Sequence, residues 1–102
     1  MVNHPKRAMN GKEIYVLVTT AHKGVFAGYA TETNSKTIRL RDARNCIYWP
    51  SSVGGFVGLA NAGPNKDTKI GPKATMTLHD ITAVLECTPE AEQAWIDAKW
   101  KF

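Results

Sequence analysis

The chain has 102 residues, of which 43% are hydrophobic and 22% are charged, and its formal net charge is +4. This length suits one domain with one core, and the composition excludes a disordered chain. No run approaches the roughly 20 apolar residues of a membrane span, and no apolar signal segment follows the basic start. We therefore expect a flexible basic arm over 1–12, a single domain over 13–102, a cytoplasmic location and no membrane partner.

The cysteines and histidines show no spacing typical of a metal site or a redox site. Cys46 and Cys87 lie 41 positions apart, which predicts two free, buried thiols. No P-loop, nucleophile elbow or GxGxxG motif occurs. We expect a protein that is not an enzyme, with no catalytic residues, no metal and no cofactor, although a Cys/His pair assembled in space remains open at this stage.

The first predicted elements form a hairpin. The run IYVLVTT (14–20) is apolar on both alternating faces, which is typical of a strand covered on both sides. The turn AHKG leads to a second strand over 25–33, in which Gly28 indicates a bulge or a close contact.

The next segment predicts β structure with one cationic face. In TIRLRD (37–42) apolar residues alternate with Arg39 and Arg41, and NCIYW (45–49) resumes the pattern before Pro50 ends it. Ser51 or Ser52 is then expected to cap a short helix over 53–62, which Gly63 closes, and a loop follows over 64–73.

The last third predicts two short strands, or one bent strand, over 74–88, with His79-Asp80 interrupting the alternation. Thr88 and Pro89 are typical of a helix start, and Ala91 and Trp95 share an apolar stripe, so we expect a C-terminal helix over 89–99. The expected fold is α+β: a mostly antiparallel five- or six-stranded sheet with a short glycine-rich middle helix and a C-terminal helix.

One stretch, residues 39–55, gathers side chains suited to a nucleotide. Guanidinium groups match phosphate oxygens, aromatic rings can stack a base, and serines and glycines at a helix start can offer hydroxyl and amide groups. The predicted ligand-binding residues are Arg39, Arg41, Arg44, Tyr48, Trp49, Ser51, Ser52, Gly54 and Gly55.

Structural interpretations of the same residues stay open. Alternating arginines are typical of a solvated strand face, a Tyr-Trp pair before proline is typical of core and edge, and helix glycines often serve close packing. A second functional alternative is contact with nucleic acid or an acidic host protein through the basic arm and the 36–44 face. Trp100 and Phe102, at the chain end, suggest a homo-oligomer.

Three segments resemble a family of small proteins encoded by bacteriophages and prophages. They are YVLVTTAHKGVFAGYATE (15–32), IRLRDARNCIYW (38–49) and ITAVLECTPEAEQAW (81–95), which are similar to the family pattern AGVFAGY…L-x-x-AR…YW…CT-x-x-A, with Lys23 in place of the first alanine. The sequence departs from this family in its glycine-rich SVGGFVGLANAG, where a serine- and leucine-rich helix is expected.

The resemblance implies a phage protein acting in the host cytoplasm and supplies no catalytic residues. Small phage proteins of this kind include inhibitors of host defence, among them oligomeric sponges that sequester nucleotide signals without cleaving them. We therefore expect a binding protein that captures an anionic nucleotide-type small molecule, with the inhibitor or accessory-factor role as the alternative.

Overall fold

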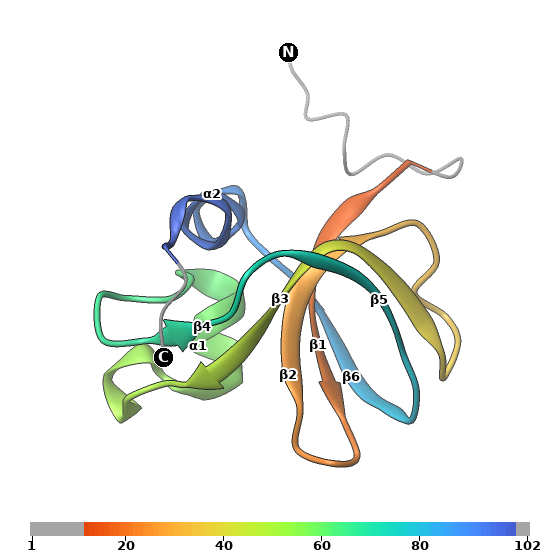
Figure 1. The fold of residues 1–102 in the computed structure, drawn as a ribbon, viewed down its shortest axis with the longest axis horizontal. Coiled ribbons are helices and arrows are strands. Elements are labelled where there is room, and N and C mark those ends of the chain that lie inside the picture. Colours follow the sequence, from red (N-terminus) through yellow and green to blue (C-terminus); the bar gives the residue numbers. More distant parts are fainter. Residues whose placement is uncertain (1–11, 100–102) are drawn as a thin grey trace.

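A computed structural model describes residues 12–99, so residues 1–11 of the arm predicted over 1–12 and the aromatic residues Trp100 and Phe102 lie outside the described residues. Six strands and two α-helices form an α+β fold, which confirms the predicted class (Figure 1). The elements in chain order are β1 (Ile14–Thr20), β2 (Val25–Ala30), β3 (Ile38–Tyr48), the 3-10 helix η2 (Ser51–Val53), α1 (Gly55–Asn61), β4 (Lys69–Ile70), β5 (Ala74–Leu78), β6 (Ile81–Glu86) and α2 (Pro89–Asp97).

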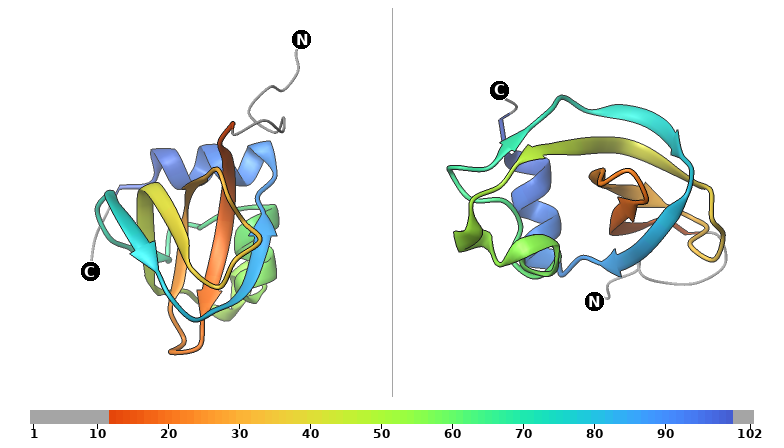
Figure 2. Two further views of the ribbon diagram at one scale, coloured as in Figure 1. Left: turned by 90° about the vertical axis from the view of Figure 1, so that its right-hand side faces the viewer. Right: turned by 90° about the horizontal axis from the view of Figure 1, so that it is seen from below.

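The sheet is an antiparallel meander that curls until its last strand lies beside its first. The order is β4-β3-β2-β1-β6, and β5 also pairs with β3, so β4 and β5 follow one another along the same side of β3. A turn at His79 and Asp80 joins β5 to β6, which returns to β1 (Figure 2). The Ile81 amide also donates to the Lys36 carbonyl at 3.2 Å, which ties β6 to the start of β3.

β1 is buried on both faces, as its sequence predicts. Tyr15 and Leu17 belong to the core under the helices, whereas Val16 and Val18 belong to the core inside the curl of the sheet. The hairpin with β2 is confirmed, with Val16 opposite Gly28. Burial on both sides explains why this run carries no polar face.

α2 begins where the sequence predicts and ends at Asp97. The Thr88 hydroxyl accepts a hydrogen bond from the Ala91 amide at 3.0 Å, and Pro89 occupies the first turn. Trp95 is fully buried, and its indole N–H donates to the Leu59 carbonyl at 3.0 Å, which joins the two α-helices. Cys46 and Cys87 are both buried, and no disulfide joins them.

The middle of the chain differs from the prediction in three ways. The two predicted stretches over 37–49 form the single strand β3, and the predicted loop contains β4. The prediction that a serine caps the middle helix is wrong: Ser51–Val53 form η2, and Gly54, at φ 83°, precedes α1 without a side-chain cap.

Backbone conformation and close packing explain why glycines occur in this region. A Cβ at Gly58 would lie 1.6 Å from the Val53 carbonyl oxygen, so only glycine allows α1 to pack against η2. Close packing, one of the interpretations left open by the sequence, therefore explains the glycine in the body of this helix. Among the described residues, no helix is long and apolar enough to cross a membrane.

Candidate functional site

A β-bulge in β3 brings polar side chains together at one end of the sheet. The register between β3 and β5 shifts between Leu40 and Ala43, and Asp42 adopts a φ of 53°, which non-glycine residues rarely adopt. On the neighbouring strand, a Cβ at Gly28 would lie 2.9 Å from the Ala43 Cα, so the bulge needs glycine there. This confirms the prediction of a close contact at Gly28.

The bulge positions Arg41 between two carboxylates. The Arg41 Nε donates to both Glu13 carboxylate oxygens at 2.9 and 3.0 Å, and Nη2 donates to Oε1 at 2.7 Å. Nη1 donates to the Asp42 Oδ2 at 2.6 Å. Because a guanidinium has five N–H groups, one N–H on each Nη remains available for a further acceptor.

The same guanidinium lies 4.6 Å from the centre of the Tyr29 ring. The Tyr29 hydroxyl donates to the Glu92 carboxylate at 2.9 Å, and its ring meets Tyr15 edge-on with 4.9 Å between centroids. Burial, assisted by Glu92, raises the pKa of Tyr29 to about 12. Tyr29 is therefore a fixed, neutral support under Arg41.

The ion pair keeps its own groups charged. Hydrogen bonds from Arg41 lower the pKa of Glu13, and the same bonds raise the pKa of Arg41. Half of the Arg41 side chain is exposed to solvent. The guanidinium is thus oriented in advance and remains accessible.

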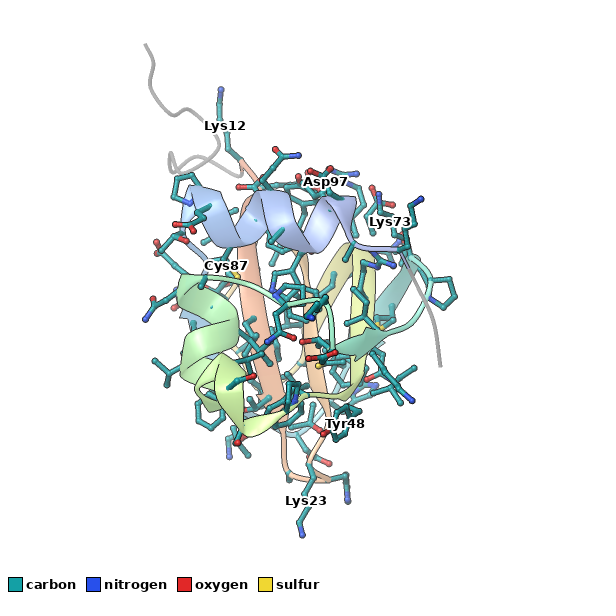
Figure 3. The ribbon with its side chains drawn as sticks, turned by 90° about the vertical axis from the view of Figure 1, so that its left-hand side faces the viewer. Lys12, Lys23, Tyr48, Lys73, Cys87 and Asp97 are labelled. Atoms are coloured by element: carbon teal, nitrogen blue, oxygen red, sulfur yellow. The ribbon has the colours of Figure 1, made fainter. Side chains whose placement is uncertain are left out.

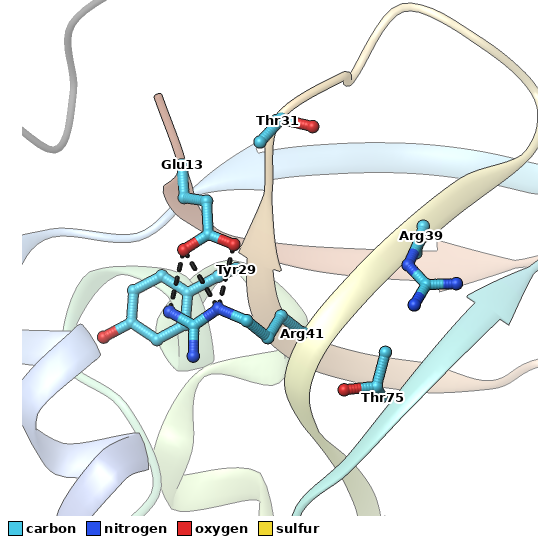
Figure 4. Close-up of a pocket in the computed structure, with 6 residues that line it drawn as sticks. All are labelled: Glu13, Tyr29, Thr31, Arg39, Arg41 and Thr75. Carbon is cyan, nitrogen blue, oxygen red and sulfur yellow. Dashed lines mark hydrogen bonds and ion pairs between the residues drawn. The ribbon is translucent and has the colours of Figure 1, made fainter. Parts of the chain in front are cut away.

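Two hollows share Arg41 and Tyr29. The first, which we call the Arg39 hollow, has a volume of about 330 Å³ (Figure 4) and is lined by Glu13, Tyr29, Thr31, Arg39, Arg41 and Thr75. The second, the Lys73 hollow, has a volume of about 180 Å³ and is lined by Tyr15, Tyr29, Arg41, Asp42, Lys73 and Ile96. Arg39 and Lys73 are exposed, and neither forms an ion pair within residues 12–99.

Of the nine predicted site residues, Arg39 and Arg41 are brought together. Arg44 is only 3% exposed and donates to the backbone carbonyls of Gly71 at 3.0 Å, Trp95 at 2.9 Å and Ala98. Burial lowers its pKa. The prediction that Arg44 faces a ligand is corrected: it binds the carbonyl end of α2, where the helix dipole favours a cation.

The aromatic residues lie elsewhere. Tyr48 is 51% exposed and lies toward the end of the molecule opposite Lys73 (Figure 3). Trp49 lines a separate apolar hollow of about 530 Å³ with Phe56 and Lys23. The base-stacking roles predicted for Tyr48 and Trp49 therefore do not apply to the hollows beside Arg41.

The serines and glycines after Pro50 also lie outside both hollows. Ser51 and Ser52 are exposed, and the Ser52 hydroxyl accepts a hydrogen bond from the Asn65 side chain at 3.2 Å. Gly54 and Gly55 have φ values of 83° and 69° at the start of α1. Of the predicted ligand-binding residues, only Arg39 and Arg41 therefore line the two hollows.

Sequence reasoning missed several residues that line the site, namely Glu13, Tyr29, Thr31, Asp42, Lys73 and Thr75. Of the sequence features noted above, only Gly28 pointed to this region, because it indicated that another strand lies close to the strand that contains Tyr29. Within residues 12–99, no group of three or more histidine, cysteine or acidic side chains is placed to hold a metal ion.

Residues 13–95 match the model of a family described as Domain of unknown function (DUF6948), and the chain belongs to this family. No curated protein and no solved structure matches the chain significantly. The matched segment begins at Glu13 and includes both arginines of the Arg39 hollow as well as Lys73.

Proposed function

We propose that this member of the DUF6948 family is a non-enzymatic binding protein that captures a small anionic molecule of the nucleotide class in the Arg39 hollow. One observation carries the proposal. A guanidinium held by two carboxylates and a tyrosine ring keeps free N–H groups beside a second arginine that has no carboxylate partner within residues 12–99.

The roles follow from the chemistry of the lining residues. Arg39 supplies the uncompensated charge for a phosphate, and Arg41 adds donors in a fixed fork. The hydroxyls of Thr31 and Thr75 line the same hollow. A planar base can stack on the Arg41 guanidinium, which itself rests on Tyr29. The resemblance to phage proteins supports a host defence signal as the ligand and sequestration in the host cytoplasm as the purpose.

Thermal unfolding with a panel of mononucleotides, cyclic di- and trinucleotides and ADP-ribose tests this function. Ligand at about one hundred times its Kd stabilises the folded state by about 2.7 kcal/mol. Arg39→Ala should abolish the shift, whereas Lys36→Ala, an exposed cation outside the hollow, should keep it. Chromatography of the recovered ligand should show it unchanged. The absence of any shift across the panel would refute the proposal, and a converted ligand would refute its non-enzymatic part.

A second function is favoured by the distribution of exposed lysines and arginines. Lys36, Arg39, Lys69 and Lys73 are exposed along β3 and its neighbours β4 and β5. Such a row suits the phosphates of a nucleic acid or an acidic host protein. Oligonucleotide affinity that falls steeply with salt, and weakens equally in Lys69→Ala and Arg39→Ala, would favour this function over the small-molecule one.

A further inference from the structure

The Lys73 hollow adds a second cationic position next to the proposed ligand site. Lys73 lies in the connection between β4 and β5, beside the C-terminal end of α2 (Figure 3). It is exposed, and it makes no ion pair within residues 12–99. Asp42, the acid that lines this hollow, accepts a hydrogen bond from Arg41 and forms an ion pair with it. The Lys73 hollow therefore keeps one cation without a carboxylate partner.

The charge balance has to be taken over both hollows together, because Arg41 lines both. Among the described lining residues, the acids Glu13 and Asp42 both bind Arg41, so the cations Arg39, Arg41 and Lys73 leave a net charge of +1, and Arg39 and Lys73 are the cations that no carboxylate contacts. Arg41 and Tyr29 line both hollows, so the two hollows adjoin at this stacked pair. A ligand that crosses the pair would meet Arg39 at one end and Lys73 at the other.

We infer, on the basis of the proposed function, that the ligand carries two separated phosphates, one held in the Arg39 hollow and one in the Lys73 hollow. Cyclic dinucleotides belong to this class, whereas a mononucleotide with one phosphate fills only one position. The central part of the ligand rests on Arg41. The Asp42 Oδ1, which accepts no hydrogen bond from Arg41, is placed to accept one from an exocyclic amine of a base.

Isothermal titration calorimetry with cyclic di-AMP, cyclic di-GMP, AMP and GMP tests this inference. The wild-type protein should bind a cyclic dinucleotide at least tenfold more tightly than the matching mononucleotide. Lys73→Ala should remove this advantage, while Lys69→Ala, a neighbouring exposed lysine outside both hollows, should keep it. Equal thermal stability of the unliganded variants shows that each is folded.

The outcomes separate the two proposals. Mononucleotide binding that depends on Arg39 but gains nothing from a second phosphate, or from Lys73, would overturn the inference and leave the proposed function standing. If none of the four nucleotides binds, the inference fails. The proposed function fails as well only if no ligand of the wider panel used in the thermal unfolding experiment shifts the melting temperature.

Discussion

Arg41 and Asp42 are consecutive residues of one β-strand, yet their side chains pair at 2.6 Å. In a regular strand, neighbouring side chains point to opposite faces, so this contact requires the bulge at Asp42. The bulge leaves Asp42 in a rarely adopted conformation, at a cost of about 1–3 kcal/mol that the surrounding structure must offset. Strain of this kind at a hollow lined by charged groups agrees with a binding role for it.

The first prediction concerns the opposite side of the bulge. Gly28→Ala places a Cβ 2.9 Å from the Ala43 Cα, so β2 and β3 must move apart. We expect unfolding free energy to fall by about 1–3 kcal/mol, measured by urea denaturation, and nucleotide affinity to fall with it. Gly71→Ala is the control, because its nearest neighbours lie 3.9 Å away and it should change stability little. Equal stability of the two variants would contradict the packing argument.

The second prediction concerns Arg44. Arg44→Met keeps most of the buried stem but leaves three carbonyls without their donor, among them those of Trp95 and Ala98. We expect a loss of about 3 kcal/mol in unfolding free energy, because hydrogen bonds to charged groups contribute about 1.5–3 kcal/mol each and the losses are only partly additive. Arg39→Met, on the exposed face, should stay within about 0.5 kcal/mol. Similar melting temperatures for both variants would refute the structural role of Arg44.

The third prediction is a loss of stability in acid that depends on Glu13. Its pKa in the folded protein lies below 4.5, so the ion pair stabilises the fold above pH 4.5 and this contribution disappears as the pH falls below that value. Glu13→Gln should therefore cost about 0.5 kcal/mol at pH 7, a typical value for a partly exposed pair, and less as the pH falls toward 3. Thermal melts from pH 7 to pH 3 measure this difference.

Glu32→Gln is the control for the acid experiment, because its carboxylate accepts the Asn34 amide, a contact that a glutamine oxygen can also make. At pH 7 this variant should unfold with nearly the same free energy as the wild type. If the cost of Glu13→Gln were equally large at pH 3 and pH 7, the ion pair would not be its source.

The fourth prediction concerns alkaline conditions. Because the pKa of Tyr29 rises from 10.0 to about 12 on folding, its neutral form stabilises the fold below pH 10 and this contribution is lost as the pH rises toward 12. Tyr29→Phe removes the hydrogen bond to Glu92, so it should lower stability by about 1–3 kcal/mol at pH 8. Above pH 10 the stability of the variant should fall less steeply than that of wild type, as measured by urea denaturation at each pH.

A part of the alkaline slope should survive in that variant. Burial also raises the pKa of Tyr15 well above its ordinary value, and Tyr15 remains present. An unchanged slope in Tyr29→Phe would show that Tyr29 ionises in the folded state as easily as in the unfolded one.

Elements defined by neighbouring residues were predictable from the sequence, whereas Arg39 and Arg41 were the only residues of the Arg39 hollow that the sequence predicted. β1 shows its burial in an unbroken apolar run, and α2 shows its start in Thr88 and Pro89. The bulge at Asp42, by contrast, depends on the registers of two other strands. Nothing in the sequence distinguishes Arg44 from an exposed arginine, because the carbonyl groups that bury and bind it belong to the end of α2, about fifty residues further along the chain.

The return of β6 to the side of β1 also has a consequence for biosynthesis. β1 reaches only one of its two neighbours when the hairpin forms, and Leu17 and Val18 stay uncovered until residues 81–86 have been translated. Contacts between segments so distant in sequence slow folding, because the intervening loop must close first. A nascent chain that stalls before β6 will therefore expose the apolar side chains of β1, a segment of high β propensity. We expect chaperones that bind unfolded chains to recognise this segment.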